Sequence, residues 1–451
     1  MIQAPDSASE SASESDSESE SDSESESDSA SASDSESESE SETESETETE
    51  TETETDSASE SESESESESE SESESESESE SEADNRVAPP RTHPRPPPHR
   101  VDLTARDHPR STDACATPAT MPTARAVILI GSGGPEALAL GDIDVRDPGH
   151  GELLVDVVAA GLNRADLLQR RGLYPAPPGV IADVPGLEYA GRVAAVGPGV
   201  RAFAVGDRVM GIVAGGAMAT HLVVHEREAL PVPATLSMAE AAAVPEAFLT
   251  SYDALFLQAG LRAGERVLIH AVASGVGTAA LMLAKRAGAR TLGTSRTKDK
   301  LTRCSGLGLD EGILVGKDRA FAKEVKARTK WRGADVALDL VGGAYLSENL
   351  ASMAPLGRVV VVGLMGGASG ELPLGLLLAQ RLSVRGTVLR SRPLEEKAAL
   401  AQRFHAEVLG GFEDGSLRPI VDEVFPMDQV AEAHRRLESN DTFGKLVLTW
   451  D

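Results

Sequence analysis

The segment that most restricts the fold is ERVLIHAVASGVGTAALMLAKRAGA, residues 265–289. In it an apolar strand pattern ends at His270, a turn of small residues follows, and a helical pattern begins. Glycines in such a turn let the backbone approach a phosphate, and the helix N-terminus presents unpaired N–H groups to it. The fit to G-x-G-x-x-G is incomplete, because Val272 and Ser274 stand at the first two glycine positions. The strand, turn and helix nevertheless predict a dinucleotide-binding turn, formed by Ser274, Gly275, Val276 and Gly277.

The sequence on either side of this segment predicts two domains. Over 247–390, apolar strand patterns alternate with amphipathic helix patterns, which is typical of a parallel sheet covered on both faces. Residues 121–246 instead hold short β-rich runs separated by Gly and Pro, which predicts a small, mainly antiparallel domain. The 451 − 120 = 331 residues after position 120 exceed the usual size of one hydrophobic core, in agreement with two domains.

The first part of the chain cannot supply a core. Residues 7–82 are Ser, Glu, Asp, Thr and Ala only, so no apolar surface offsets the entropy of ordering them. We expect a disordered Ser/Glu-rich acidic tail over 1–84 and a Pro/Arg-rich linker over 85–120. A solvated spacer, a serine-phosphorylated or cation-binding segment, and a gene-model artefact with Met121 as the true start are the three open interpretations of this region.

Nearly all the net charge lies before position 121. Residues 1–120 hold 38 acidic and 6 basic residues, which leaves 75 − 38 = 37 acidic and 42 − 6 = 36 basic residues for the rest. A body of net charge −1 lacks the excess of cations that binding to nucleic-acid phosphates requires. The two cysteines exclude a four-cysteine zinc site, and no apolar run approaches the ~20 residues of a membrane span. We expect a soluble cytoplasmic protein that binds neither nucleic acid nor membrane.

The order of several segments matches a known family from Met121 to Thr449. Among them are LNRADLLQRRGLYPAPPG, VPGLEYAGRVAAVGPGV, VPEAFLTSYDAL, VLIHAVASGVGTAALMLAKRAGA and GKLVL. With these segments the chain resembles the quinone oxidoreductase (zeta-crystallin-like) branch of the medium-chain dehydrogenase/reductase superfamily, most closely its tumour-suppressor-inducible members. The resemblance implies an α/β fold with a GroES-like catalytic domain over 121–246 and a doubly wound Rossmann nucleotide-binding domain over 247–390. It also implies that a C-terminal segment, 391–451, returns to the catalytic domain, and that the protein is a homodimer.

Residues after the second strand of the nucleotide domain indicate the cofactor. The chain reads GTSRTKDK there, with Ser295, Arg296 and Lys300 at or just after the strand end. A carboxylate at this place would bind the ribose of NADH, whereas cations bind the 2'-phosphate of NADPH. A solvated charge run is the alternative. We expect NADPH, with Lys300 at the 2'-phosphate by the resemblance, although Val315 replaces a tyrosine that the related branch carries near the adenosine phosphate.

The superfamily also contains zinc alcohol dehydrogenases, whose ligands this chain lacks. By the resemblance, Asn163 stands where those enzymes have a ligand cysteine, and Leu187 stands where they have a ligand histidine. Without a Lewis acid, alcohol oxidation by the zinc route is unavailable, whereas hydride donation to a quinone or an activated alkene remains possible. We therefore expect no metal site, and an NADPH:quinone oxidoreductase. An enone or enoyl reductase and a cofactor-binding protein with little turnover are the alternatives.

The resemblance also assigns residues to the site. It implies that Asn163 and Tyr174 lie beside the nicotinamide and the substrate, where Asn163 would bond to the acceptor oxygen or an ordered water and Tyr174 would contact the cofactor. A turn residue and a packed aromatic are the respective alternatives. The further cofactor contacts that it implies are Thr250, Ser274, Gly275, Val276, Gly277, Ser295, Lys300, Gly363, Leu364, Leu389, Ser391 and Lys445.

Overall fold

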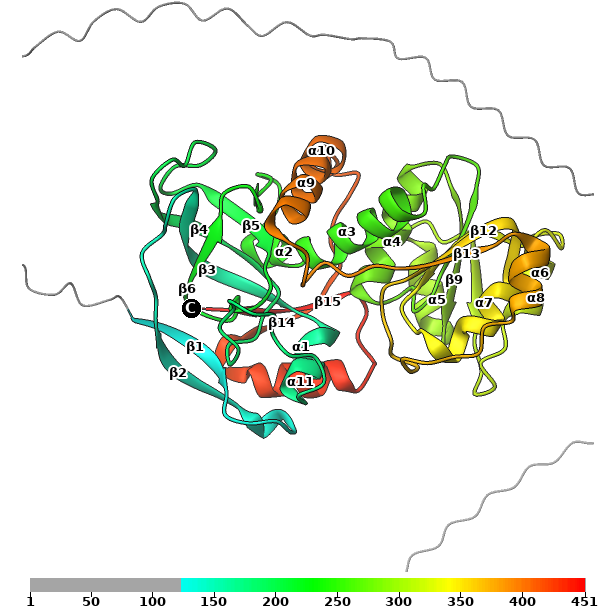
Figure 1. The fold of residues 1–451 in the computed structure, drawn as a ribbon, viewed down its shortest axis with the longest axis horizontal. Coiled ribbons are helices and arrows are strands. Elements are labelled where there is room, and N and C mark those ends of the chain that lie inside the picture. Colours follow the sequence, from blue (N-terminus) through cyan, green and yellow to red (C-terminus); the bar gives the residue numbers. More distant parts are fainter. Residues whose placement is uncertain (1–122, 451) are drawn as a thin grey trace, which may run out of the picture. The chain divides into compact units, whose positions relative to one another are not determined.

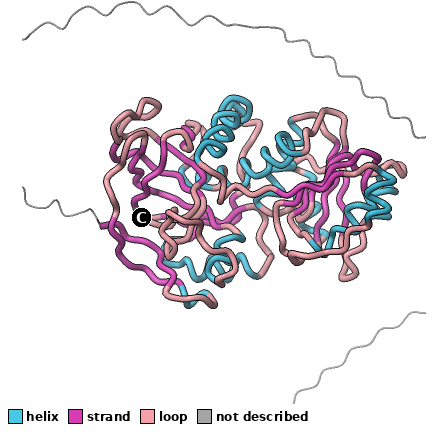
Figure 2. The backbone as a smooth tube through the Cα atoms, viewed as in Figure 1, coloured by secondary structure: helices cyan, strands magenta, loops and turns pink. Residues whose placement is uncertain are grey.

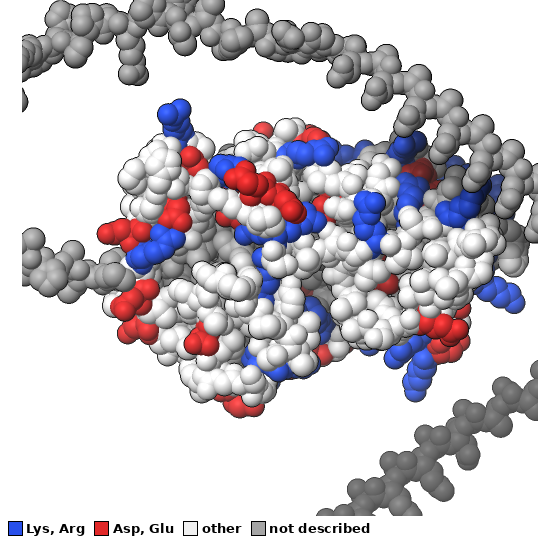
Figure 3. Space-filling model, viewed as in Figure 1, with Lys and Arg blue, Asp and Glu red and all other residues white. Residues whose placement is uncertain are grey.

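The computed structural model describes residues 123–450, shown in colour in Figure 1. The acidic tail expected over 1–84 and the linker expected over 85–120 lie outside the described residues. Within the described part, none of the helices has the length and apolar composition to cross a bilayer. Lys and Arg are interspersed with Asp and Glu on the face shown in Figure 3, in keeping with the near-neutral composition of this part.

Two separate groups of strands organise the described chain (Figure 2). One is a six-stranded sheet in the order β10-β9-β8-β11-β12-β13, with all neighbouring strands parallel. Numbered along the sequence this is the order 3-2-1-4-5-6 of a doubly wound nucleotide-binding fold, so the expected Rossmann domain is confirmed. The strands are β8 (Arg266–Ile269), β9 (Arg290–Ser295), β10 (Glu311–Leu314), β11 (Ala334–Asp339), β12 (Met353–Val361) and β13 (Ser383–Gly386).

Helices cover both faces of this sheet because its strands are apolar on both sides. Val267 and Ile269 of β8 pack in one buried cluster with residues of η2 and α4, whereas Leu268 between them packs in another with residues of α6 and α7. Alternate side chains of a strand point to opposite faces, so each face receives its own helical layer. The helical elements of this half are α3 (Pro245–Tyr252), η2 (Asp253–Gln258), α4 (Gly275–Arg286), α5 (Lys298–Ser305), α6 (Ala322–Arg328), η3 (Gly343–Tyr345), α7 (Leu346–Ser352) and α8 (Leu374–Gln380).

The second group is a seven-stranded sheet in the order β14-β15-β3-β4-β5-β7, with β6 paired to β3. Apart from the parallel pair β14–β15, its pairings are antiparallel, as expected for a GroES-like domain. A separate hairpin joins β1 to β2. The strands are β1 (Thr123–Leu129), β2 (Leu138–Asp144), β3 (Glu152–Leu162), β4 (Glu188–Val196), β5 (Arg208–Ile212), β6 (His221–His225), β7 (Ala229–Pro231), β14 (Val421–Pro426) and β15 (Lys445–Thr449).

The end of the chain adds strands to this sheet, since β15 pairs antiparallel with β3 (Figure 1). A buried cluster formed with Phe248, Tyr252, Phe404 and Phe412 joins α3 to α9 and α10. The remaining helical elements are η1 (Pro135–Ala137), α1 (Arg164–Arg170), α2 (Met238–Ala242), α9 (Leu394–Phe404), η4 (His405–Leu409), α10 (Gly410–Glu413), η5 (Met427–Gln429) and α11 (Val430–Glu438).

Candidate active site

The turn after β8 has the form that the sequence predicts. Ser274 is the N-cap of α4, and its Oγ accepts a hydrogen bond from the backbone N–H of Gly277 at 3.0 Å. The N–H groups of Gly275 and Val276, in the first turn of the helix, have no intrahelical partners. No acidic residue lies in this first turn. The helix dipole and these N–H groups would therefore favour an anion at the carboxyl end of β8, which fits the pyrophosphate of a dinucleotide.

This turn lies where the strand order of the parallel sheet reverses. β8 is flanked by β9 on one side and β11 on the other, and ligands of open α/β sheets bind at the carboxyl ends beside such a reversal. Gly363 and Leu364 follow β12 at the same edge, and the Gly363 N–H donates to the carbonyl of Asp339 at the end of β11. The Leu364 side chain is 55% exposed, which leaves it open to contact a ligand.

Cations gather beyond the end of β9. Ser295 ends that strand, Arg296 follows it, and Lys300 on α5 donates from Nζ to the carbonyl of Asn440 at 2.5 Å. The Asn440 side chain accepts a bond from Arg164 at 2.8 Å, which brings a third cation into the group. Burial lowers the pKa of Lys300, Asp441 and Asp422 oppose this shift, and the nearby charges of Arg296 and Arg436 add to it. An anion bound beside Arg296 and Lys300 would be stabilised by their charges.

Lys445 connects the nucleotide turn to the catalytic domain. Its side chain runs against Gly275, since a Cβ on that glycine would lie 2.4 Å from Lys445 Cδ. The ammonium donates to the carbonyl of Leu162 at 2.9 Å and to Asn163 Oδ1 at 2.6 Å, and it pairs with Glu188 at 2.5 Å. Lys445 and Glu188 are 6% and 0% exposed. The buried ion pair is thus fully hydrogen-bonded on its lysine side, as a buried charge requires.

Asn163 is held on all sides by these neighbours. Its Nδ2 donates to Glu188 Oε1 at 2.9 Å and to the Gly161 carbonyl at 3.3 Å, while its Oδ1 accepts from Lys445. Both amide hydrogens are therefore engaged, and Asn163 has none free for a substrate oxygen. A glycine is required at 161, because a Cβ there would lie 2.2 Å from Glu188 Oε1. In this structure Asn163 fixes the ion pair and begins α1 as its N-cap.

Tyr174 lies in the loop after α1, half-buried under Arg390. The Arg390 guanidinium stacks 4.8 Å from the centre of the tyrosine ring and donates to the Tyr174 carbonyl at 3.0 Å. The same guanidinium donates to the Ala214 carbonyl at 2.7 Å and to Gln169 Oε1 at 2.7 Å, so its position is fixed. Burial raises the pKa of the Tyr174 phenol, which keeps it neutral and able to donate a hydrogen bond.

Two further residues with predicted cofactor contacts lie beside Arg390 in the chain. Leu389 is 4% exposed and packs in the buried cluster with Phe248 and Leu400, whereas Ser391 is exposed. Thr250 is half-buried on α3. Sequence reasoning assigned no role to Arg390, Glu188 or Glu246. The spacing of Glu246 and Thr250, one helical turn apart, is the signal that could have identified Glu246.

At the positions compared with zinc ligands, Leu187 is buried at 2% exposure and Asn163 is bonded to Lys445 and Glu188. Across residues 123–450, His, Cys, Asp and Glu side chains form no group of three or more that could hold a metal ion. Cys304 is buried, and burial raises the pKa of its thiol to about 11, so it is a packing residue rather than a nucleophile.

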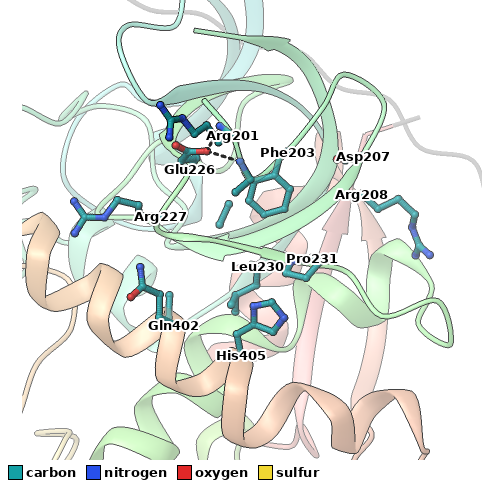
Figure 4. Close-up of a pocket in the computed structure, with 13 residues that line it drawn as sticks. Arg201, Phe203, Asp207, Arg208, Glu226, Arg227, Leu230, Pro231, Gln402 and His405 are labelled. Carbon is teal, nitrogen blue, oxygen red and sulfur yellow. Dashed lines mark hydrogen bonds between the residues drawn. The ribbon is translucent and has the colours of Figure 1, made fainter. Parts of the chain in front are cut away.

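A cavity of about 630 Å³ lies elsewhere, between the β5–β7 edge and α9–η4. His405 extends from the helical side toward Leu230, and Gln402 lies on the same side nearer to Arg227 (Figure 4). None of the residues expected to contact the cofactor lines it. This cavity is therefore separate from the predicted cofactor contacts around the turn at Ser274–Gly277.

Comparison with known proteins decides the family. Residues 149–234 match the family model described as an alcohol dehydrogenase GroES-like domain, and residues 275–405 match that of a zinc-binding dehydrogenase. The chain is 32% identical to the quinone oxidoreductase of Rattus norvegicus over 328 residues, which are 72% of this chain and 97% of the relative. The chain belongs to the zinc-independent quinone oxidoreductase branch of the medium-chain dehydrogenase/reductase superfamily. It is an oxidoreductase of that superfamily, whose members bind a nicotinamide cofactor.

Two solved structures are similar to this chain in fold. The CurK enoyl reductase is 28% identical, with a TM-score of 0.66 over 73% of this chain and 99% of that one. A mycobacterial protein solved in complex with NADPH is 29% identical, with a TM-score of 0.66 over 72% and 99%. The closer resemblance to tumour-suppressor-inducible members stays a prediction.

Proposed function

We propose that this oxidoreductase reduces quinones with NADPH and needs no zinc. The observation that best supports this proposal is the position of Lys445. Its aliphatic side chain lies against the turn at Gly275, and its ammonium donates a hydrogen bond to Asn163. It brings the turn at Ser274–Gly277 and the residues around Asn163 and Glu188 within one side-chain length of each other. Bound NADPH would supply a hydride from its nicotinamide, and the protein's task is to align the acceptor and exclude competing reactions.

Each part of the chain has a task in this proposal. The turn at Ser274–Gly277 would hold the pyrophosphate through its free N–H groups, and Thr250 on α3 would lie at the nicotinamide ribose. Tyr174, oriented by Arg390, would donate a hydrogen bond to the acceptor or cover the ring. Asn163 has no free amide hydrogen, so we assign it a positioning role through Lys445 and Glu188.

The cations beyond β9 support NADPH over NADH. Arg296 makes no ion pair among residues 123–450 and directly follows the strand whose end carries the discriminating residue in such folds. Lys300 bonds only to a carbonyl oxygen, which a phosphate can replace as its partner. We propose that Arg296 and Lys300 together hold the 2'-phosphate. Val315 is 3% exposed in the core and offers no hydroxyl to the adenosine phosphate. The two cations would supply the phosphate contacts that a tyrosine at this position supplies in the related branch.

Enone or enoyl-thioester reduction is the second candidate, and the similarity to the CurK enoyl reductase favours it. Both reactions deliver a hydride to an electrophilic acceptor, so fold alone cannot separate them. A panel assay with the full-length protein decides: NADPH oxidation is followed at 340 nm with several quinones and several enones. Faster turnover with quinones supports the proposal, whereas turnover with enones alone would replace it by the second candidate.

An exposed sheet edge supports the proposal of a homodimer. All four residues of β13, at the end of the parallel sheet, are exposed, and α8 beside it has no buried residue. Leu374 and Leu378 of α8 are 65% and 80% exposed. An edge strand without a partner, next to exposed apolar side chains, is an aggregation hazard that a second copy would remove. Sedimentation should give the dimer mass for wild type and the monomer mass for Leu378→Lys; a monomeric wild type would contradict this.

A cytoplasmic location remains part of the proposal on the sequence evidence.

A further inference from the structure

Glu246 occupies an unusual position on α3. Of the eight residues of that helix, six are buried and only Glu246 and Thr250 are half-buried. Residues four apart lie on the same face of a helix, so these two form one partly exposed stripe on an otherwise buried helix. Thr250 is expected at the nicotinamide ribose, which puts the Glu246 carboxyl group one helical turn from it, toward the residues around Asn163.

The backbone fixes Glu246 beside the buried ion pair. Its N–H donates to Glu188 Oε2 at 2.8 Å, and Glu188 in turn is paired with Lys445. The Glu246 carboxyl group itself makes no hydrogen bond and no ion pair with any residue of 123–450. A carboxyl group in such surroundings without a partner is available to a ligand. The charged and titratable groups that face it from neighbouring elements are Glu188 on β4, Asp166 on α1, Lys445 on β15, and Arg390 and Tyr174 in their loops.

Most of the other polar groups nearby are already bonded to protein partners. The Lys445 ammonium makes three bonds, to Leu162, Asn163 and Glu188, and both amide hydrogens of Asn163 are used. Asp166 accepts from the N–H groups of Asn163 and Gly186 at the base of α1 and is fully buried. The Tyr174 hydroxyl and the Glu246 carboxyl group remain, and a phenol is the weaker acid of the two.

We propose that Glu246 is the proton donor of the reduction, an inference that rests on the proposed function. Hydride addition to a quinone converts it to the hydroquinone monoanion, and the nicotinamide is oxidised to NADP⁺. The O–H bond of Glu246 breaks as an O–H bond to the developing phenolate oxygen forms, which gives the neutral hydroquinone and a carboxylate. Solvent water then returns a proton to Glu246, so that NADPH, H⁺ and quinone are consumed for each hydroquinone formed.

The charges around Glu246 suit this role. Burial raises its pKa to about 8, Glu188 and Asp166 raise it as well, and Lys445 and Arg390 oppose the rise. The group therefore carries its proton at pH 7 and loses it as the pH rises through about 8. A donor with a pKa near the working pH combines a populated acid form with an effective transfer.

The test compares full-length wild type with Glu246→Gln, Glu246→Asp and the surface control Glu432→Gln, whose side chain is 59% exposed. General acids contribute about 100- to 10,000-fold, so kcat of the Gln variant should fall at least about 100-fold. The kcat of Glu246→Asp should lie between those of Glu246→Gln and wild type, and the kcat of Glu432→Gln should equal that of wild type. NADPH affinity, measured by fluorescence titration, should stay unchanged in the Gln variant, which shows that it is folded. Wild-type kcat should decline above pH 8, whereas the residual activity of Glu246→Gln should not change there.

A series of quinones separates proton donation from a structural role. The loss in Glu246→Gln should shrink as the product hydroquinone becomes more acidic, because a stable anion needs no donor. An equal loss for every quinone, or full activity of Glu246→Gln beside an active wild type, would overturn this inference alone. If wild type fails to oxidise NADPH with every quinone and every enone tested, the proposed function is overturned, and this inference with it.

Discussion

Replacement of Lys445 by methionine tests the buried link between the two domains. Methionine keeps the unbranched side chain that lies against Gly275 but removes the ammonium. Three hydrogen bonds are lost, to Leu162, Asn163 and Glu188. Glu188, which is 0% exposed, keeps only two bonds, from Asn163 Nδ2 and the Glu246 N–H. The variant thus leaves an uncompensated buried carboxylate.

The size of the effect follows from that burial. Breaking a buried ion pair by removing one partner costs about 3 to 5 kcal/mol. With an unfolding entropy of about 2.1 cal/mol/K per residue, a body of roughly 330 residues has about 0.7 kcal/mol/K, so Tm should fall by about 4 to 7 °C. The exposed pair of Lys285 and Asp310 is a matched control, because Lys285→Met should cost no more than about 1 kcal/mol.

A double-mutant cycle, followed by scanning calorimetry and urea unfolding, measures the coupling free energy between Lys445 and Glu188. The proteins are wild type, Lys445→Met, Glu188→Gln and the double variant. The double variant should be more stable than Lys445→Met alone, because it no longer buries a charge. A cost below about 1 kcal/mol for Lys445→Met, equal to that of the surface control, would refute the reasoning, since an exposed pair contributes that little.

The other predictions concern metal, cofactor and tail. Chelator treatment should leave turnover unchanged, because Asn163 and Leu187 stand at the ligand positions; a loss that added zinc restores would contradict this. Lys300→Ala should raise KM for NADPH roughly 10- to 150-fold, the equivalent of about 1.5 to 3 kcal/mol for a charge-assisted bond, and should spare NADH. Equal weakening with both cofactors would assign Lys300 to the fold. Removal of residues 1–120 should leave kinetic constants and Tm unchanged at physiological ionic strength, where charges act over about 8 Å. A lower Tm would show that the tail stabilises the enzyme.

The features that sequence reasoning recovered are local in the chain. The turn at Ser274–Gly277 and the alternation of strands and helices each depend on short sequence segments. The apolar periodicity and the glycines within such a segment favour its backbone conformation. The match of whole segments in order then supplied the GroES-like domain, which the β-rich runs alone left without a topology.

The contacts that sequence reasoning missed join distant residues. Lys445 and Asn163 are 282 positions apart, and their bond depends on how β15 pairs with β3. The resemblance implied that Asn163 bonds to the acceptor oxygen, and in the structure both of its amide hydrogens bond to protein atoms. Glu246 was likewise unassigned, because the proton affinity of its carboxyl group depends on burial and on charges from three other elements and a loop.

The most direct test of the account is a steady-state assay of the full-length protein with NADPH and with NADH against a quinone panel, before and after exhaustive chelation. We expect NADPH to be oxidised only when quinone is present, with a higher kcat/KM than NADH and at the same rate after chelation. A preparation that binds NADPH but transfers no hydride to any quinone, or one whose activity rises and falls with its zinc content, would contradict it.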